Sequence, residues 1–168
     1  TGTPTSTTPA ASLAVKPRVT APAAAPVAAV EIADSVVVTV NVGVVDAVSV
    51  NNAAVDYTHG NDELIISLPA PSNKNQTLTF TIQYHGIPFD GLRIGATKFG
   101  DRSFFNENWP NRGRHWLPIL DHPNDKATSE FIVTAPDHYK VVSNGLLLEE
   151  SSLGNNTKLT HWKQSVPV

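Results

Sequence analysis

Apolar and polar residues alternate most clearly over Thr77–Tyr84, where Leu, Phe, Ile and Tyr occupy every second position. Because successive side chains of a strand point to opposite faces, this period of two predicts a strand with one buried face. Apolar and β-branched runs separated by turn residues predict further strands at Ser35–Val42, Val44–Val50, Glu63–Leu68, Ala127–Ala135, Tyr139–Leu148 and Lys158–Lys163. We expect Asn51 and Asn52 to form a turn.

The remaining segments predict loops and strand irregularities. Residues 87–111 are rich in Gly, Asn, Asp and aromatics and predict a long irregular loop. Pro118 makes Arg114–Leu120 an edge strand or a bulge. Glu149–Thr157 is the expected loop of a hairpin, and Gly145 marks either a bulge or a turn. No helical period is present, so the fold class predicted is all-β, as an antiparallel sandwich or a saddle-like bent sheet with long loops.

The first thirty residues have a composition of their own, being nearly all Thr, Pro, Ala, Ser and Val. Five prolines there exclude a continuous helix or a central strand. We therefore divide the chain into a low-complexity Ala/Pro/Thr leader over residues 1–30 and a β-domain over residues 31–168. An alternative is that some letters before about residue 55 are wrongly assigned, which peptide masses would show.

Charge and cysteine content exclude several functional classes. The 168 residues carry a net charge of −3, without the basic excess that nucleic-acid binding requires, so we expect no nucleic-acid partner. The absence of Cys excludes disulfides, thiolate metal ligands and a cysteine nucleophile. No apolar run approaches the roughly 18 residues of a membrane span. The chain also lacks Met, and we expect it to be part of a longer protein.

No motif in the chain identifies a catalytic centre. None of the six histidines is followed by Glu, so a zinc-peptidase helix of the form H-E-x-x-H is absent. His115, Asp121, His122 and Asp125 could bind a metal, but their irregular spacing favours structural roles. Carboxylate pairs remain open as well, at Asp90/Asp101 or Asp101/Glu107. We predict no catalytic and no metal-binding residue.

An aromatic, amide-rich segment at Phe104–Pro110 has two interpretations. Phe104, Phe105 and Trp109 could cap one end of the core. Alternatively, Trp109 could form the apolar wall of a binding cleft, with Glu107 as its polar contact. The residues alone do not decide between the two.

A series of short motifs in the second half of the chain resembles one family. The series runs through Arg114-His115-Trp116-Leu117-Pro118, Asp121-His122-Pro123, Asp125-Lys126-Ala127-Thr128, Val133-Thr134-Ala135-Pro136, Val141-Val142-Ser143-Asn144-Gly145-Leu146 and Thr160-His161-Trp162. In this order, the motifs resemble the N-terminal β-domain of the aminopeptidase N family of zinc peptidases, in its bacterial secreted type. The resemblance covers about residues 64–168.

This resemblance implies a non-catalytic domain that shapes the substrate cleft of a zinc aminopeptidase. The zinc would belong to a separate C-terminal catalytic domain, which is the expected partner together with the peptide substrate. In the family a Glu or Gln of the β-domain receives the substrate's α-amine. That position falls on Trp109 here, so the resemblance implies substrate binding by Trp109 and the nearby Glu107. We also expect an apolar face that the partner domain covers.

The other motif residues are expected to hold the fold. Asp121 and Pro123 form a capped turn, Lys126 or Arg114 pairs with Asp121 or Asp125, and Trp116, Asn144 and Gly145 shape the chain around them. The resemblance implies a secreted or periplasmic location. Competing hypotheses are a β-sandwich module that binds carbohydrate or protein, and a structural repeat of a surface protein.

Overall fold

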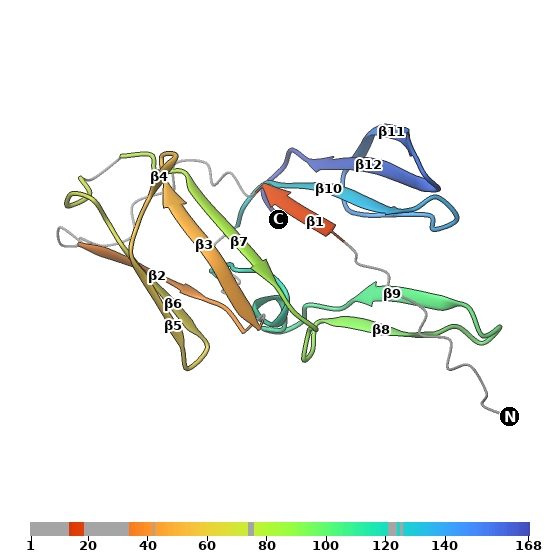
Figure 1. Ribbon diagram of the computed structural model, residues 1–168, viewed down its shortest axis with the longest axis horizontal. Coiled ribbons are helices and arrows are strands. Elements are labelled where there is room, and N and C mark those ends of the chain that lie inside the picture. The colour runs from red at the N-terminus through yellow and green to blue at the C-terminus, as the bar shows by residue number, and fades with distance from the viewer. Residues whose placement is uncertain (1–13, 19–33, 42, 74–75, 121–123, 125) are drawn as a thin grey trace, which may run out of the picture. The chain divides into compact units, whose positions relative to one another are not determined.

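Twelve strands and one short 3₁₀ helix make up the computed structural model, which describes residues 14–18, 34–41, 43–73, 76–120, 124 and 126–168 (Figure 1). The strands are β1 (Ala14–Arg18), β2 (Ser35–Thr39), β3 (Val44–Val50), β4 (Ala53–Ala54), β5 (Tyr57–Gly60), β6 (Glu63–Ser67), β7 (Phe80–His85), β8 (Leu92–Ala96), β9 (Arg102–Asn106), β10 (Ser129–Pro136), β11 (Leu146–Gly154) and β12 (Thr157–Gln164). The 3₁₀ helix η1 is Gly113–His115. The described residues contain no α-helix, and the all-β prediction is confirmed. None of their helices is long and apolar enough to cross a membrane.

The chain divides into two compact units. A terminal unit combines Thr1–Pro22 with Lys126–Val168, and a central unit is formed by Ala23–Asp125. Each unit has its own antiparallel sheets. The candidate site residues Glu107 and Trp109 belong to the central unit.

Two three-stranded sheets of the central unit share one apolar core. The first has the order β2-β6-β5 and the second β4-β3-β7. Leu64 and Ile66 of β6 are fully buried, and they share this core with the buried residues Val45, Val48 and Val50 of β3. Between Leu64 and Ile66, Ile65 points the other way and is exposed. Burying one such side chain stabilises the fold by about 1.5–3 kcal/mol, so this alternation is what orients both sheets.

The period of two predicted around Thr77–Tyr84 is confirmed in β7. Phe80, Ile82 and Tyr84 are half-buried against the core, whereas Thr81 and Gln83 are exposed. The predicted turn between β3 and β4 is also present, with Asn51 and Asn52 at φ values of 50° and 70°. Asn tolerates this left-handed backbone better than most residues.

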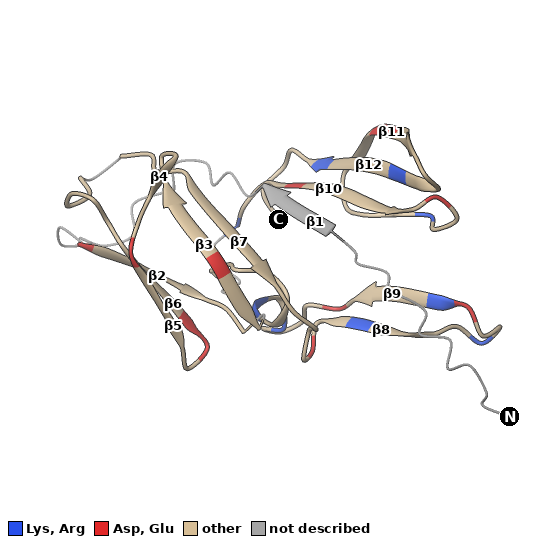
Figure 2. Ribbon diagram, viewed as in Figure 1, with Lys and Arg blue, Asp and Glu red and all other residues tan. Residues whose placement is uncertain are grey.

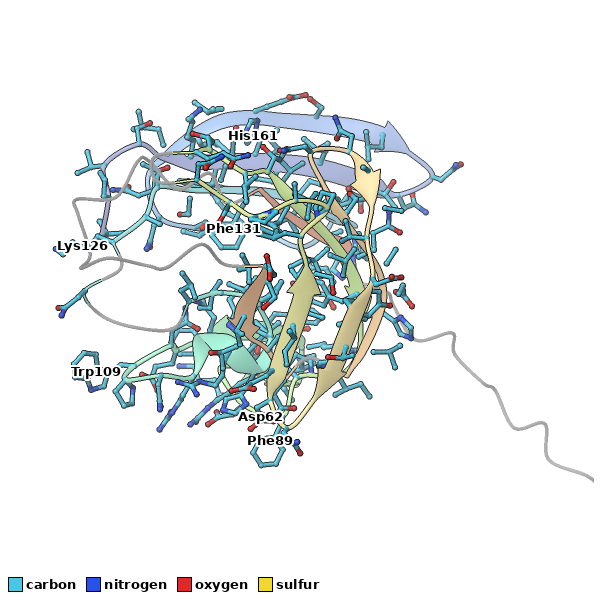
Figure 3. All side chains as sticks on the ribbon, turned by 90° about the vertical axis from the view of Figure 1, so that its left-hand side faces the viewer. Asp62, Phe89, Trp109, Lys126, Phe131 and His161 are labelled. Carbon is cyan, nitrogen blue, oxygen red and sulfur yellow. The ribbon has the colours of Figure 1, made fainter. Side chains whose placement is uncertain are left out.

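The terminal unit is one four-stranded sheet with the order β1-β10-β12-β11. In this sheet His161 of β12, labelled in Figure 3, is opposite Ile132 of β10. Its Nε2 lies 2.7 Å from Oε1 of Glu130, which is also on β10. Strand β1 lies inside the segment expected to be a leader. It contains Pro17, which a strand at the edge of a sheet tolerates because only one of its sides pairs.

The hairpin prediction for the terminal unit was right in kind and wrong in its bounds. Glu149–Thr157, expected to be a loop, is mostly the strand β11, and the turn is reduced to Asn155 and Asn156. Polar residues fit this strand because it lies at the sheet edge and is almost entirely exposed. A bulge was one of the two structures expected at Gly145, but the irregularities in the pairing of β11 lie between Leu147 and Glu149 and between Ser152 and Gly154.

Two further predictions fail between residues 87 and 120. The segment 87–111, expected to be irregular, contains the hairpin β8–β9. Arg114–Leu120, expected to be an edge strand or bulge, contains part of η1 and then only a single bridge between Thr39 and Ile119. The short strands β4 and β5 were not predicted either, because neither has a run of β-branched residues.

Candidate functional site

The loop that follows β9 carries both sequence-predicted site residues. Glu107 comes directly after the last pair of the β8–β9 hairpin, Leu92 with Asn106, and its main-chain N–H donates to the Gly91 carbonyl at 2.8 Å. The main-chain N–H of Trp109 donates to Glu107 Oε1 at 3.2 Å. The Glu107 carboxylate and the Trp109 main chain are therefore directly joined.

The Trp109 ring projects into solvent (Figure 3). It is 75 % exposed, and Phe105 is 64 % exposed. Neither ring caps the core, so the interpretation of this segment as a core lid is wrong for both residues. An exposed, rigid indole beside a carboxylate has the composition of a ligand-contact surface.

Arg112 links the carboxylates of Glu107 and Asp90. Its Nη1 lies 2.6 Å from Glu107 Oε2, and its Nε lies 3.4 Å from Asp90 Oδ2. Two carboxylates and one guanidinium leave a formal charge of −1 at this point of the surface. A cationic group of a ligand is attracted to this cluster, because the net formal charge of the cluster is negative.

The approach of two backbone segments positions Arg112. Gly91 has φ +76°, and a Cβ there would lie 2.2 Å from the Arg112 carbonyl oxygen. Only glycine fits at this position, which is both left-handed and too close to its neighbour for a side chain. The start of the hairpin is thereby held against the loop that carries Arg112.

Trp116 anchors the other end of the loop. Its Nε1 donates to Asn108 Oδ1 at 2.9 Å, and its carbonyl accepts the Tyr84 hydroxyl at 3.0 Å. Burial raises the pKa of Tyr84 to about 12, because the charged phenolate would lose its hydration there. The loop is thus tied to β7 by a hydroxyl that stays neutral across the physiological range.

The remaining motif residues have structural surroundings. Arg114 belongs to η1, its Nε donates to the Asn111 carbonyl at 3.1 Å, and its own carbonyl accepts the Asn41 N–H. Asp121, Pro123 and Asp125 lie outside the described residues, so the predicted pairs of Arg114 and Lys126 with these acids stay predictions. Lys126 itself is exposed.

Asn144 and Gly145 lie directly before β11. Gly145 has φ +88°, and a Cβ there would meet the Lys163 carbonyl oxygen at 2.0 Å. Its role is close approach to β12 and not the predicted bulge. Neither residue belongs to the unit that carries Glu107.

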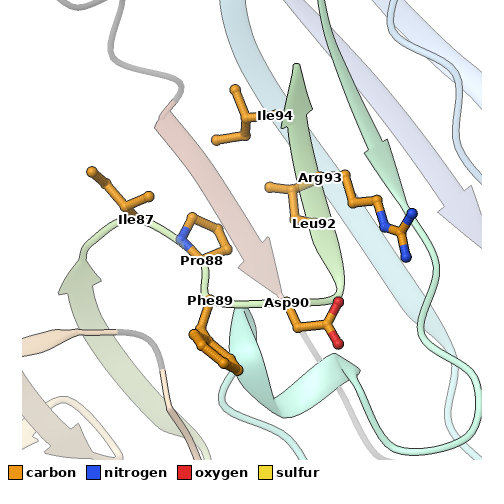
Figure 4. A pocket seen from close by; sticks show the side chains of 7 residues that line it. All are labelled: Ile87, Pro88, Phe89, Asp90, Leu92, Arg93 and Ile94. Carbon is orange, nitrogen blue, oxygen red and sulfur yellow. The ribbon is translucent and has the colours of Figure 1, made fainter.

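A shallow depression of about 330 Å³ lies beside the carboxylate cluster (Figure 4). It is lined by residues of β8 and of the segment before it, namely Ile87, Pro88, Phe89, Asp90, Leu92, Arg93 and Ile94. The depression therefore combines apolar side chains with one carboxylate of the cluster and one guanidinium.

The described residues do not fit a catalytic zinc ion. No group of three or more His, Asp or Glu side chains with metal-binding geometry occurs among them. Of the four residues weighed as metal ligands and interpreted as structural, His115 belongs to η1, and Asp121, His122 and Asp125 lie outside the described part of the chain.

Sequence reasoning missed Arg112, Asn108 and Tyr84, and it named Asp90 only as a member of an open carboxylate pair with Asp101. The opposite charges of Glu107 and Arg112, five residues apart, could have indicated an ion pair. The two residues lie in a loop, however, and a loop has no regular repeat from which the direction of its side chains can be predicted. Arg112 joins Asp90 to Glu107, which are one member of each of the two carboxylate pairs left open.

The chain matches the Peptidase M1 N-terminal domain family over residues 15–168. It belongs to this family. The resemblance to the aminopeptidase N family is therefore confirmed, and the comparisons give no support to an independent carbohydrate- or protein-binding module. No curated protein matches the chain significantly in sequence.

Solved structures of longer zinc peptidases contain the same fold. An M1 zinc metallopeptidase from Deinococcus radiodurans is 26 % identical with a TM-score of 0.70, over 81 % of this chain and 32 % of that one. A mutant of it, bound to a Tyr-Ser-Ala substrate, is 25 % identical with a TM-score of 0.70, over 80 % and 32 %. A mutant described as a two-domain M1 zinc metallopeptidase bound to L-arginine is 25 % identical with a TM-score of 0.67, over 80 % and 32 %. This chain thus spans about one third of the length of these relatives.

Proposed function

We propose that this M1 N-terminal domain is the non-catalytic part of a zinc aminopeptidase and contacts the amino end of the peptide substrate. The family match over residues 15–168 carries the proposal. Zinc and the groups that activate water belong to a separate catalytic domain in this scheme, because the described residues offer no zinc site. The domain contributes a wall and a charged anchor to the substrate cleft.

Glu107 and Trp109 are the proposed contacts to the peptide. The cluster of Asp90, Arg112 and Glu107 has a net formal charge of −1, which suits the α-ammonium group of a free peptide. The exposed indole of Trp109 provides an apolar surface for the first side chain. Arg112 remains paired with Asp90 when Glu107 turns to the ammonium.

The test uses the complete enzyme and compares substrates with free and acetylated amino ends. A charge-assisted hydrogen bond contributes about 1.5–3 kcal/mol, so Glu107→Gln should lower kcat/KM for an aminoacyl p-nitroanilide by roughly tenfold to a hundredfold. The loss should appear mainly in KM and should be much smaller for the acetylated substrate. Trp109→Ala should raise KM most for substrates with large first side chains.

Glu149→Gln is the matched control, since Glu149 is an exposed glutamate of β11 in the other unit. It should leave both substrates unaffected. If Glu107→Gln prefers the free-amine substrate over the acetylated one as strongly as the wild-type enzyme does, Glu107 is not the anchor. A complete protein without zinc-dependent release of amino acids removes the whole proposal. The 168-residue chain alone should be inactive with or without zinc.

Two finer features belong to the same proposal. The parent enzyme is proposed to be secreted or periplasmic, which fractionation of the source cells would test. The sheets β2-β6-β5 and β4-β3-β7, which supply residues to one core, are interpreted as the two layers of a β-sandwich.

A further inference from the structure

The loop between β9 and η1 carries a set of hydrogen bonds that closes around the Glu107 carboxylate. We call residues 107–112 the anchor loop, because they include both proposed contacts to the peptide. Glu107 Oε1 accepts the main-chain N–H of Trp109 at 3.2 Å, and Oε2 accepts Nη1–H of Arg112 at 2.6 Å. In Figure 2 an acidic segment follows β9 and a basic segment lies around η1. The direction of the carboxylate therefore depends on the course of the backbone between residues 107 and 112.

Asn108 is bonded through both its main chain and its side chain. Its carbonyl accepts the main-chain N–H of Arg112 at 2.9 Å, which closes the anchor loop on itself. Its Oδ1 accepts the indole Nε1–H of Trp116 at 2.9 Å. Asn108 thus contacts the residue that holds Glu107 and also a residue outside the loop.

Trp116 is a donor of fixed position. Its carbonyl accepts the Tyr84 hydroxyl at 3.0 Å, and Tyr84 packs against the apolar core of the central unit. Its main-chain N–H donates to the Gly113 carbonyl of η1 at 3.1 Å, and its side chain is half-buried. A side chain held at several points gives its hydrogen-bond partner a defined place. The bond from Trp116 therefore transmits the position of the sheet to Asn108.

Glu107 and Asn108 are held by different elements. The main-chain N–H of Glu107 donates to the carbonyl of Gly91, just before β8, at 2.8 Å, whereas Asn108 is held by Trp116, just after η1. Burial does not restrain the loop here, because residues 108–110 are all exposed. Without the Asn108 side-chain bond, the backbone between Glu107 and Trp109 would be held at one end only.

We propose that Asn108 is a positioning residue for the amino end of the peptide. Its bond to Trp116 sets where the Glu107 carboxylate and the Trp109 indole lie, although Asn108 itself does not contact the substrate. The inference rests on the proposed function and extends it by one residue. A misplacement of about 1 Å can lower the rate of an enzyme about a hundredfold, so a single exposed hydrogen bond can matter more for substrate binding than for folding.

Three variants of the complete enzyme test this role. Asn108→Leu removes the acceptor oxygen and keeps a side chain of similar size. Asn108→Asp keeps an oxygen that can accept the Trp116 N–H. Asn111→Leu is the matched control, since Asn111 is an exposed asparagine of the same loop, and its hydrogen bond with Arg114 uses its main-chain carbonyl and not its side chain.

We expect Asn108→Leu to raise KM for an aminoacyl p-nitroanilide by roughly three- to tenfold, the range that one hydrogen bond supplies, with kcat changed less than about twofold. KM for the acetylated substrate should change less than about twofold, and neither Asn108→Asp nor Asn111→Leu should raise KM more than that. A similar loss with both substrates overturns the proposal. Asn108→Asp as impaired as Asn108→Leu overturns it as well.

A double-mutant cycle with Glu107→Gln asks whether Asn108 acts through the anchor. If it does, adding Asn108→Leu to Glu107→Gln should raise KM by less than about twofold more, because both changes remove the same contact to the substrate. Full additivity of the two effects contradicts a positioning role.

Hydrogen exchange of the complete protein separates this role from a folding defect. In Asn108→Leu the amides of residues 107–112 should exchange at least about threefold faster, while those of β6 and β7 stay as in the wild type. Unchanged exchange in the anchor loop overturns the proposal, and faster exchange in β6 and β7 overturns it in favour of a role in the fold.

The kinetic results also distinguish this inference from the proposed function. An unimpaired Asn108→Leu enzyme beside an impaired Glu107→Gln enzyme refutes the positioning role alone. An unchanged KM in Glu107→Gln refutes the proposed anchor and, with it, the role of Asn108 in substrate binding.

Discussion

Two antiparallel hairpins of the central unit, β5–β6 and β8–β9, have different environments. In the hairpin of β5 and β6, Leu64 and Ile66 are fully buried, because β6 also pairs with β2 and shares a core with β3. In the hairpin of β8 and β9 the strands pair only with one another, and most side chains of β8 are exposed. Local strand pairing is the same in both, so burial follows from a third strand and a facing sheet and not from the hairpin itself.

The largest expected effect comes from shortening one apolar side chain in each hairpin. Leu64→Ala should destabilise the domain by about 2–5 kcal/mol, since it leaves a cavity in a fully buried site. Ile94→Ala should cost less than about 0.5 kcal/mol in the 168-residue chain, because Ile94 is partly exposed already. Urea unfolding followed by circular dichroism measures both. Similar losses for the two variants would mean that the β8–β9 hairpin has a core of its own.

Two glycines of the β8–β9 region allow the cost of a left-handed backbone to be compared with the cost of a close backbone contact. Gly91 and Gly100 both have positive φ, but only at Gly91 would an added Cβ also lie 2.2 Å from the Arg112 carbonyl oxygen. Gly100→Ala should cost about 1–2 kcal/mol for the left-handed backbone alone. Gly91→Ala should cost about 3 kcal/mol or more, because the strand and the anchor loop must separate. Equal costs in urea unfolding would show that the close approach at Gly91 contributes nothing.

Tyr84 tests the attachment of the loop through pH. Its folded-state pKa of about 12 lies above the unfolded value of 10, so its stabilising contribution is complete below pH 10. Between pH 10 and 12 the unfolded state releases the proton first, and stability should fall by about 2–3 kcal/mol.

The variant Tyr84→Phe removes the hydroxyl that bonds to the Trp116 carbonyl and should cost about 1 kcal/mol at neutral pH. In this variant the part of the fall in stability between pH 10 and 12 that Tyr84 causes should also be absent. Tyr139→Phe, in the terminal unit, serves as the control for alkaline effects unrelated to Tyr84. Parallel pH curves for the wild-type chain and Tyr84→Phe would contradict the burial of this hydroxyl.

The smallest expected effect concerns Arg112. The Arg112→Gln variant should destabilise the 168-residue chain by about 1 kcal/mol or less, since its ion pairs with Glu107 and Asp90 are about one third exposed. In the complete enzyme the same change should raise KM for free peptides, because Glu107 loses the group that orients it. A stability loss as large as that of Leu64→Ala would make Arg112 a residue of the fold and not of the site.

Sequence patterns were most informative where one face of a strand is buried. The alternation around Thr77–Tyr84 and the run Glu63–Leu68 located β7 and β6, because the core requires apolar residues at every second position. Strand β8 and the part of β11 from Glu149 onward were mistaken for loops, since an uncovered or edge strand tolerates Gly, Glu and Ser. For the site, Glu107 and Trp109 came from the aromatic segment and the motif resemblance, whereas Arg112 and its link from Glu107 to Asp90 came only from the coordinates.

The order of residues by itself determined the all-β class, the positions of the core strands and membership of the M1 N-terminal family. These depend on periodicity and on local motifs, which neighbouring residues encode. The tertiary structure decided that Arg112 joins Asp90 to Glu107, that Tyr84 holds Trp116, and that the β8–β9 hairpin has exposed rings. The first two features are contacts between different segments of the chain, and the third depends on whether another element covers a strand. The energy of such contacts depends on distance in space and not on spacing in the sequence.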